Sequence, residues 1–176
     1  AVYGVMIYNG LVQVKHAVAK AWANIDVLLK QRHDELPKLV ETCKQYMGYE
    51  KDVLQKVTEA RAAVSKAQAS GDVGALGKAE TQMRLGLASL FAVAENYPEL
   101  RANESFQHLQ ARITQLEAQI ADRREFYNDS VNANNVRIEQ FPDGIVANLF
   151  KFGPRELLTF DGAELKDVDV KALFNG

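Results

Sequence analysis

Long stretches of this sequence place apolar residues three and four positions apart, which is the spacing of one face of an α-helix. The clearest stretch predicts a helix from about residue 103 to residue 140, with Asn103 as its N-cap and a stop at Phe141-Pro142. Three further apolar stripes precede it, over residues 14–32, 36–64 and 76–97. The stripe of the last helix consists of Phe106, Leu109, Ile113, Leu116, Ile120, Tyr127, Val131, Ile138 and Phe141.

Breaks between the stripes are few, because the chain has only four prolines and eleven glycines. Residues 69–74 predict a hairpin turn. Pro37 and Pro98 mark either corners or bends in two very long helices, and we favour corners because proline removes an amide donor and clashes with the preceding turn. The sequence therefore predicts an all-α chain: an antiparallel up-and-down four-helix bundle of long, proline-kinked helices, with an irregular C-terminal tail.

Composition and motifs argue against several function classes. The formal net charge is -2 and the basic residues are dispersed, so we expect no nucleic-acid partner. Cys43 is the single cysteine, which excludes an intramolecular disulfide and a cysteine-based zinc site. The Glu-x-x-His motif of di-iron bundles is absent, as are phosphate-binding loops and nucleophile motifs. We therefore expect no enzyme, no catalytic residue, no cofactor and no metal.

Polar residues interrupt the apolar stripes at several positions. Charges close to a core are costly unless they are paired. The favoured interpretation is a buried polar network that fixes the register of the helices. The alternative is a polar site inside the bundle that binds a ligand or performs chemistry. The predicted network consists of Asp26, Arg32, Glu50, Arg61, Arg123 and Asn134.

A family resemblance emerges from three long, irregular motifs. Residues 22–61 resemble the pattern of the LemA family, and residues 90–110 and 123–142 carry its Ala-x-Tyr-Pro-x-Leu, Ala-Asn-x-x-Phe, Arg-x-x-Tyr-Asn and Phe-Pro elements. "YNGLV" at residues 8–12 fits the start of the same pattern. The matching positions in the first motif are Trp22, Asp26, Arg32, Leu36, Pro37, Leu39, Val40, Glu41, Tyr46, Glu50, Val57, Arg61 and Ala62.

The resemblance implies a bacterial protein with one N-terminal membrane helix followed by a helical bundle outside the cytoplasm, and it implies no established activity. We expect residues 1–7 to be the remnant of the membrane helix, residues 8–141 the bundle and residues 142–176 the tail. Fewer than ten apolar residues cannot span a bilayer. A plain helix start is the alternative for the opening residues. The expected membrane or assembly contacts there are Tyr3, Met6, Ile7 and Tyr8.

The tail carries aromatic residues among glycine, proline and aspartate, so it should bury them somewhere. Phe150 and Phe152 are the expected contacts. Three surfaces are possible: the chain's own bundle, a neighbouring copy, or lipid. Packing on a neighbouring copy would be head-to-tail, which permits rings or filaments.

Two functional hypotheses follow. The favoured one is a non-catalytic scaffold of the bacterial cell membrane, which acts by self-assembly or by contact with the membrane and membrane proteins. Its expected partners are the membrane, further copies of the chain and a membrane protein. The alternative is a ligand-binding or enzymatic bundle that uses the polar network, or an accessory subunit of an envelope enzyme such as a membrane peptidase.

Overall fold

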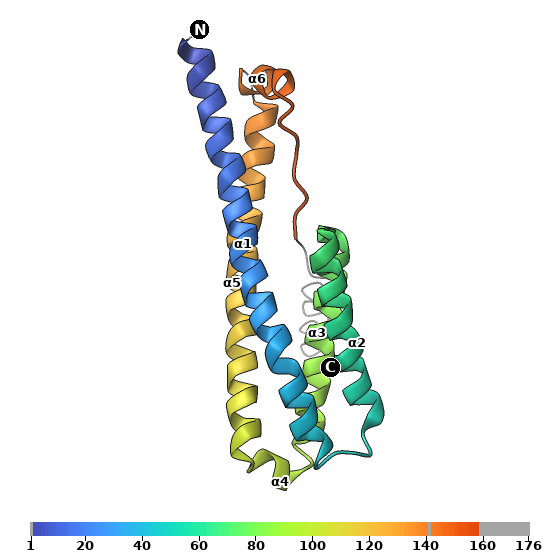
Figure 1. Cartoon of the computed structure of the whole chain (residues 1–176). Coiled ribbons are helices and arrows are strands. Elements are labelled where there is room, and N and C mark those ends of the chain that lie inside the picture. Colours follow the sequence, from blue (N-terminus) through green and yellow to red (C-terminus); the bar gives the residue numbers. More distant parts are fainter. Residues whose placement is uncertain (1, 141, 159–176) are drawn as a thin grey trace, which may run out of the picture. The chain divides into compact units, whose positions relative to one another are not determined.

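The computed structural model of the chain describes residues 2–140 and 142–158, and every regular element in those ranges is a helix. The predicted all-α class is confirmed. Phe141 and the part of the predicted tail from residue 159 onward lie outside the described residues. The helices are α1 (Val2–Lys44), α2 (Lys51–Ser70), α3 (Val73–Ala94), α4 (Pro98–Arg101), α5 (Glu104–Glu139) and α6 (Asp143–Leu149) (Figure 1).

The described chain divides into two compact units. Unit 1 contains residues 2–28, 119–140 and 142–158, and unit 2 contains residues 29–118. The long helices α1 and α5 each contribute one part to each unit, whereas α2, α3 and α4 lie wholly in unit 2. Each unit has its own buried residues and is described separately.

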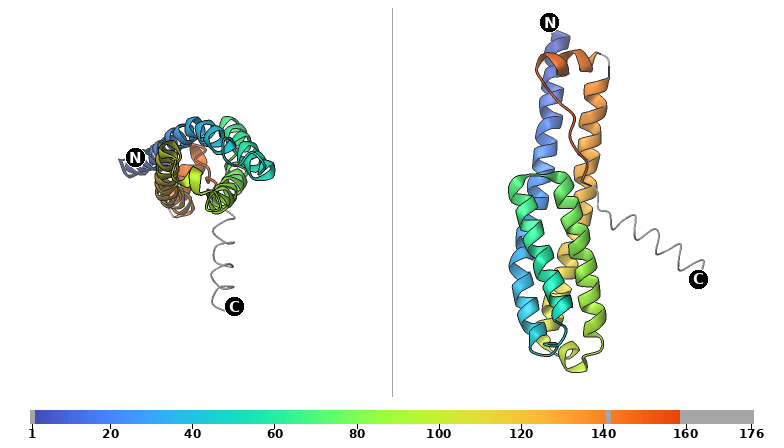
Figure 2. Two further views of the ribbon diagram at one scale, coloured as in Figure 1. Left: turned by 90° about the horizontal axis from the view of Figure 1, so that it is seen from below. Right: turned by 90° about the vertical axis from the view of Figure 1, so that its right-hand side faces the viewer.

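Unit 2 contains the α2–α3 hairpin. Gly71 takes the left-handed conformation that ends α2, with φ of 72°, and its amide donates to the carbonyl oxygen of Ala67. Asp72 then caps α3, because its Oδ1 accepts a hydrogen bond of 3.0 Å from the amide of Ala75. The hairpin predicted over residues 69–74 is confirmed. Figure 2 shows α2 and α3 side by side with the parts of α1 and α5 that belong to unit 2.

The core of unit 2 is formed by the predicted apolar stripes. Each fully buried leucine, isoleucine or phenylalanine stabilises the fold by about 1.5–3 kcal/mol. Cys43 belongs to this core, and burial raises the pKa of its thiol to about 12. Core residues no more than 2% exposed are Leu29, Leu36, Leu39, Cys43, Met47, Val57, Ala60, Leu76, Met83, Leu87, Leu90, Ala94, Leu100, Phe106, Ile113 and Leu116.

The corner predicted at Pro37 is wrong, since α1 continues through this residue to Lys44. Pro37 has no amide hydrogen for the carbonyl oxygen of His33, four residues earlier. Arg61 on α2 supplies another donor, and its Nε lies 3.0 Å from that oxygen. The chain breaks instead at residues 45–50, between α1 and α2.

The second proline does form a corner. α3 ends at Ala94, and Pro98 opens the short helix α4, where its missing amide hydrogen costs nothing. Asn103 then caps α5: its Oδ1 accepts a hydrogen bond of 3.0 Å from the amide of Phe106. The predicted start of the last long helix is therefore confirmed.

Unit 1 contains the opening part of α1, the closing part of α5, helix α6 and the segment 150–158. Ile7, Leu11 and Ala147 form its buried cluster, against which Phe152 packs. The segment 150–158 runs beside the helices of the unit (Figure 1). The sequence did not predict α6, which lies inside the expected irregular tail.

Asparagine side chains on α5 hold the segment 150–158 in place. Asn128 both donates to the carbonyl oxygen of Leu158 and accepts from its amide, each at 2.8 Å. Asn135 binds the backbone of Arg155 in the same way, at 2.9 and 2.7 Å. Leu158 is fully buried. Within unit 1, this part of the tail therefore docks on the chain's own helices.

No described helix contains an 18-residue stretch that is apolar enough to cross a bilayer.

Candidate functional site

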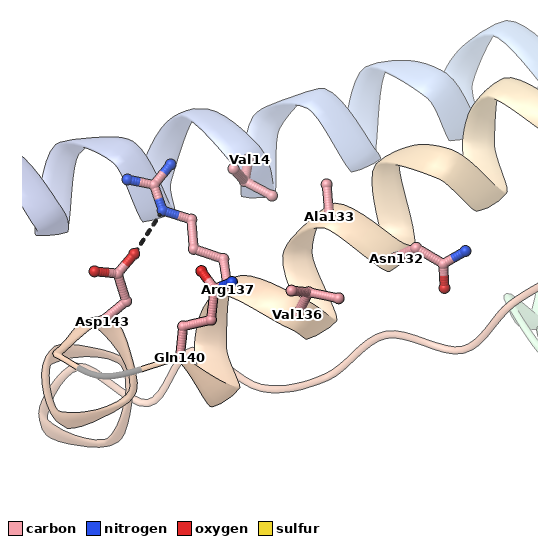
Figure 3. Close-up of a pocket in the computed structure, with 7 residues that line it drawn as sticks. All are labelled: Val14, Asn132, Ala133, Val136, Arg137, Gln140 and Asp143. Atoms are coloured by element: carbon pink, nitrogen blue, oxygen red, sulfur yellow. Dashed lines mark hydrogen bonds and ion pairs between the residues drawn. The ribbon is translucent and has the colours of Figure 1, made fainter.

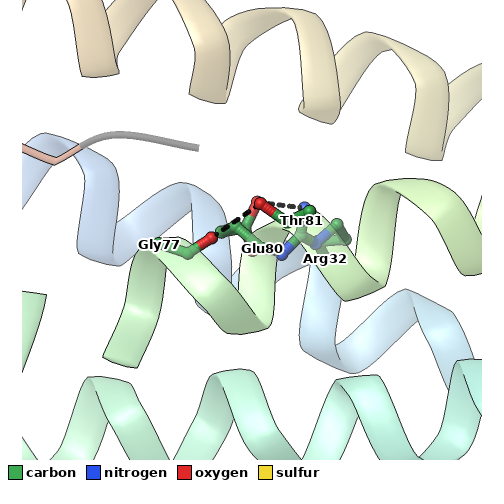
Figure 4. Close-up of polar contacts among 4 residues, drawn as sticks. All are labelled: Arg32, Gly77, Glu80 and Thr81. Atoms are coloured by element: carbon green, nitrogen blue, oxygen red, sulfur yellow. Dashed lines mark hydrogen bonds and ion pairs between the residues drawn. The ribbon is translucent and has the colours of Figure 1, made fainter. Parts of the chain in front are cut away.

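A buried ion pair lies inside unit 2. Arg32 on α1 and Glu80 on α3 are each 1% exposed. The guanidinium of Arg32 donates to both carboxylate oxygens, with a distance of 3.0 Å from Nη1 to Oε2 and a closer contact between Nη2 and Oε1 (Figure 4). Next to Glu80 on α3, the hydroxyl of Thr81 donates a hydrogen bond to the carbonyl oxygen of Gly77, one turn earlier in the helix. The pair is bidentate and is shielded from solvent.

A second carboxyl group lies near this pair. Burial raises the pKa of Glu117, on α5, to about 7; Arg32 opposes this rise and Glu80 adds to it. Its Oε1 atom is buried and has no hydrogen-bond partner among the described residues. We call Arg32, Glu80 and Glu117 the charge cluster. Arg32 and Glu80, each 1% exposed, offer a substrate no access, so the geometry of this pair favours a structural role.

The apolar stripes of the sequence predicted the burial of Arg32 but of neither carboxylate. Glu80 lies four residues after Leu76 and three before Met83, so the apolar stripe of α3 passes directly through it. That spacing could have revealed Glu80. Glu117 follows the fully buried Leu116, and no stripe position marks it.

The structure gives most of the six predicted network residues partners outside the set. Glu50 accepts a hydrogen bond of 3.1 Å from the hydroxyl of Tyr97, and Arg61 donates to the carbonyl oxygen of His33. Asn134, 3% exposed, donates to the carbonyl oxygen of Gly153. Asp26 is half-buried in unit 1. Arg32, Glu50, Arg61 and Asn134 thus each have a contact of their own, and the six predicted residues are distributed over two units.

The predicted burial of Arg123 is wrong, because its side chain is exposed and lines a surface groove of about 540 Å³ in unit 1. The reason is the step of the helix. From the buried Ile120 to the buried Tyr127, the stripe passes through position 124, and the side chain of Arg124 is half-buried. Arg123 is one position off this stripe and points away from it.

The opening residues of α1 divide into two groups. Ile7 is 6% exposed and belongs to the buried cluster of unit 1, so its prediction as a membrane or assembly contact is wrong. Tyr3 and Met6 are 64% and 65% exposed. Tyr8 contacts both tail aromatics: its ring centre lies 4.7 Å from that of Phe150 and 5.8 Å from that of Phe152.

Exposed apolar side chains gather at this end of unit 1. The contact of Tyr8 with Phe150 joins the start of α1 to the end of α6. Residues 1–14 and 144–150 contain no charged residue. We call this surface the apolar end. Its exposed members are Val2, Tyr3, Val5, Met6, Ile145, Leu149 and Phe150.

An ion pair fixes α6 to α5 below the apolar end. The Nε atom of Arg137 lies 2.9 Å from Oδ2 of Asp143, beside a surface depression of about 570 Å³ (Figure 3). The guanidinium of Arg137 occupies the space where a side chain at Gly10 of α1 would begin. Gly10 therefore allows Arg137 to pass close to α1 while it holds Asp143.

Comparison with known proteins identifies the family. The LemA family model matches residues 21–172. The chain belongs to the LemA family. Relatives of this LemA-family chain include Magnetosome protein MamQ 2 and Magnetosome protein MamQ 1 of Paramagnetospirillum magneticum, and Magnetosome protein MamQ of Magnetospirillum gryphiswaldense. Each is 23% identical over 170 aligned positions, and the match covers 84% of this chain. The chain spans about 62% of the length of these curated relatives.

Several LemA motif residues make the contacts described above. Arg61, which ends the first motif, donates to the carbonyl oxygen that Pro37 leaves free. Asn103, in the second motif, caps α5. Tyr127 and Asn128, in the third motif, bind the backbone of Glu156 and Leu158. These motif positions in the LemA-family chain thus support α1 at Pro37, cap α5 and dock the segment 150–158.

Proposed function

We propose that this chain is a non-catalytic, membrane-associated scaffold of the bacterial cell envelope. The observation that carries the proposal is the apolar end. Its exposed side chains come from two stretches, residues 1–14 and 144–150, neither of which contains a charged residue. Contiguous apolar surface of this kind marks interaction sites with membranes or proteins.

Lipid is the favoured occupant of the apolar end because of its residue types. Tyr3 and Tyr8 are aromatic residues of the kind that lie at membrane interfaces. α6 is short, and Ile145 and Leu149 on it are 54% and 73% exposed. Amphipathic segments with such residues lie in the headgroup region rather than across the bilayer. This contact needs only the part of the chain that the structure describes.

The proposed architecture for this scaffold is the antiparallel up-and-down bundle. Short connections between the helices support it, as do the contacts of Arg32 with Glu80 and of Arg61 with His33, which join α1 to α3 and α2. The family resemblance supports a bundle located outside the cytoplasm beside a membrane anchor. Further copies of the chain and a membrane protein are the proposed partners.

Vesicle flotation tests the proposal. In the variant Val2→Gln/Val5→Gln/Met6→Gln, each replaced side chain is more than half exposed, so the fold should persist. Loss of about 1 kcal/mol of apolar transfer per residue should reduce binding to phosphatidylglycerol vesicles roughly a hundredfold. The control Val27→Gln/Leu85→Gln/Val136→Gln replaces three exposed apolar residues elsewhere and should float like the original chain.

Two results would contradict the proposal: an original chain that stays unbound, or equal losses in both variants. Light scattering on the same samples tests self-assembly. A scaffold should form species larger than a monomer, and these species should be reduced by the first variant and retained by the control.

A further inference from the structure

A second surface of unit 1 has a different chemistry. A groove of about 370 Å³ opens beside the apolar end, between the start of α1, the end of α5 and the segment 150–155. Its lining contains three cationic side chains and one imidazole, and it contains no carboxylate. The lining residues are Tyr8, Val12, Lys15, His16, Asn134, Phe150, Lys151, Phe152, Gly153 and Arg155.

The backbone is held in place at two of these cationic residues, Lys151 and Arg155. Lys151 has a φ of 60°, in the left-handed region that lysine rarely adopts. The neighbouring rings of Phe150 and Phe152 both contact Tyr8, which fixes the chain on either side of Lys151. An unfavourable backbone conformation that its surroundings impose is a frequent property of binding sites.

Arg155 is fixed by a separate contact. Both backbone polar groups of Arg155 bind the side-chain amide of Asn135, and the exposed side chain of Arg155 lines the groove. Lys15, Lys151 and Arg155 are exposed, and none is in an ion pair with a carboxylate within the described part of the chain. Three cations around one groove without acidic neighbours in its lining create a positive potential that attracts anions.

We infer that this groove binds a phosphate group, with Lys15, Lys151 and Arg155 as its cationic contacts. A guanidinium matches the geometry of phosphate oxygens with two parallel donors, and the two ammonium groups neutralise the remaining charge. The phosphate belongs either to a lipid headgroup or to a free anion. The inference does not rest on the proposed function, because a soluble phosphate can occupy the groove whether or not the chain contacts a membrane.

The test uses one groove variant and one control. The groove variant is Lys151→Asn/Arg155→Gln, since asparagine tolerates the left-handed conformation and introduces no new strain. The control Lys20→Gln/Arg123→Gln removes the same charge from exposed positions of unit 1 outside the groove. Binding of inorganic phosphate and glycerol 3-phosphate is measured by calorimetry at low ionic strength, and flotation is measured on vesicles with and without phosphatidylglycerol.

The groove variant should weaken phosphate binding about 25-fold, at about fivefold for each lost charge, and the control should change it less than twofold. An equal loss of flotation on phosphatidylglycerol vesicles assigns the phosphate to a lipid, and unchanged flotation assigns it to a free anion. Equal effects of both variants, or no phosphate binding by the original chain in either assay, would overturn the inference. A chain that binds soluble phosphate through the groove but never floats would contradict only the membrane proposal.

Discussion

Arg32 and Glu80 form a buried ion pair that affects the register of the core helices more than the stability of the fold. The two charges are joined by two hydrogen bonds, but their removal from water offsets much of the attraction between them. Such a pair stabilises little relative to apolar residues of the same size. Its effect is on register, because Arg32 on α1 must face Glu80 on α3 for either charge to be buried.

Glu117, near this ion pair, should make the stability of the fold depend on pH. The pKa of Glu117 is about 7 in the folded chain, whereas its ordinary value is 4.5. Folding therefore favours the protonated form of this carboxyl group. The corresponding stability is fully present below pH 4.5 and is lost as the pH rises to about 7, by up to about 3 kcal/mol.

Urea unfolding at pH 5 and pH 8 measures this effect. Glu117→Gln should remove the loss between the two pH values, whereas Glu125→Gln, at an exposed position of the same helix, should retain it. A variant at position 117 with the pH dependence of the original chain would show that another group titrates.

At the scale of the helices, α1 contains a proline, Pro37, in its interior. Arg61 donates to the carbonyl oxygen that Pro37 leaves without a partner. Arg61→Met should therefore cost about 1–2 kcal/mol of unfolding free energy. In the background Pro37→Ala, an amide hydrogen is restored for the carbonyl of His33, and the same substitution should cost clearly less.

A double-mutant cycle from urea unfolding gives this difference directly. Equal costs of Arg61→Met in both backgrounds would mean that Arg61 acts through packing alone.

The contrast between Pro37 and Pro98 shows what the sequence can predict. Apolar spacing located α5 and its cap Asn103, and Gly71-Asp72 located the hairpin, because these signals are local. The passage of α1 through Pro37 depends on a donor that is distant in sequence, so local reasoning placed a corner there. The same limit applies to the site: Arg32 was found from its stripe, but its partner Glu80 belongs to another helix.

At the scale of the whole molecule, the two units should differ in how they open. Leu11 is fully buried in unit 1, and its cluster partners Ile7 and Ala147 belong to the same unit. Leu11→Ala should destabilise this unit by about 2–5 kcal/mol. α2 and α3 lie in unit 2, so their amides should keep their protection in hydrogen exchange.

Hydrogen exchange followed by mass spectrometry distinguishes the two units. Leu87→Ala in the core of unit 2 is the matched variant and should expose α2 and α3 first. Uniform loss of protection over the whole chain in both variants would show that the units unfold as one.

The burial of Cys43 makes the protein suitable for site-specific labelling. Its thiol is enclosed in the core and has a pKa of about 12, so at neutral pH it should not react with maleimides. A new cysteine from Leu149→Cys or Tyr49→Cys, at positions 73% and 99% exposed, would carry a spin label alone. A label at position 149 would then report immersion in lipid, and a label at position 49 would provide the aqueous reference.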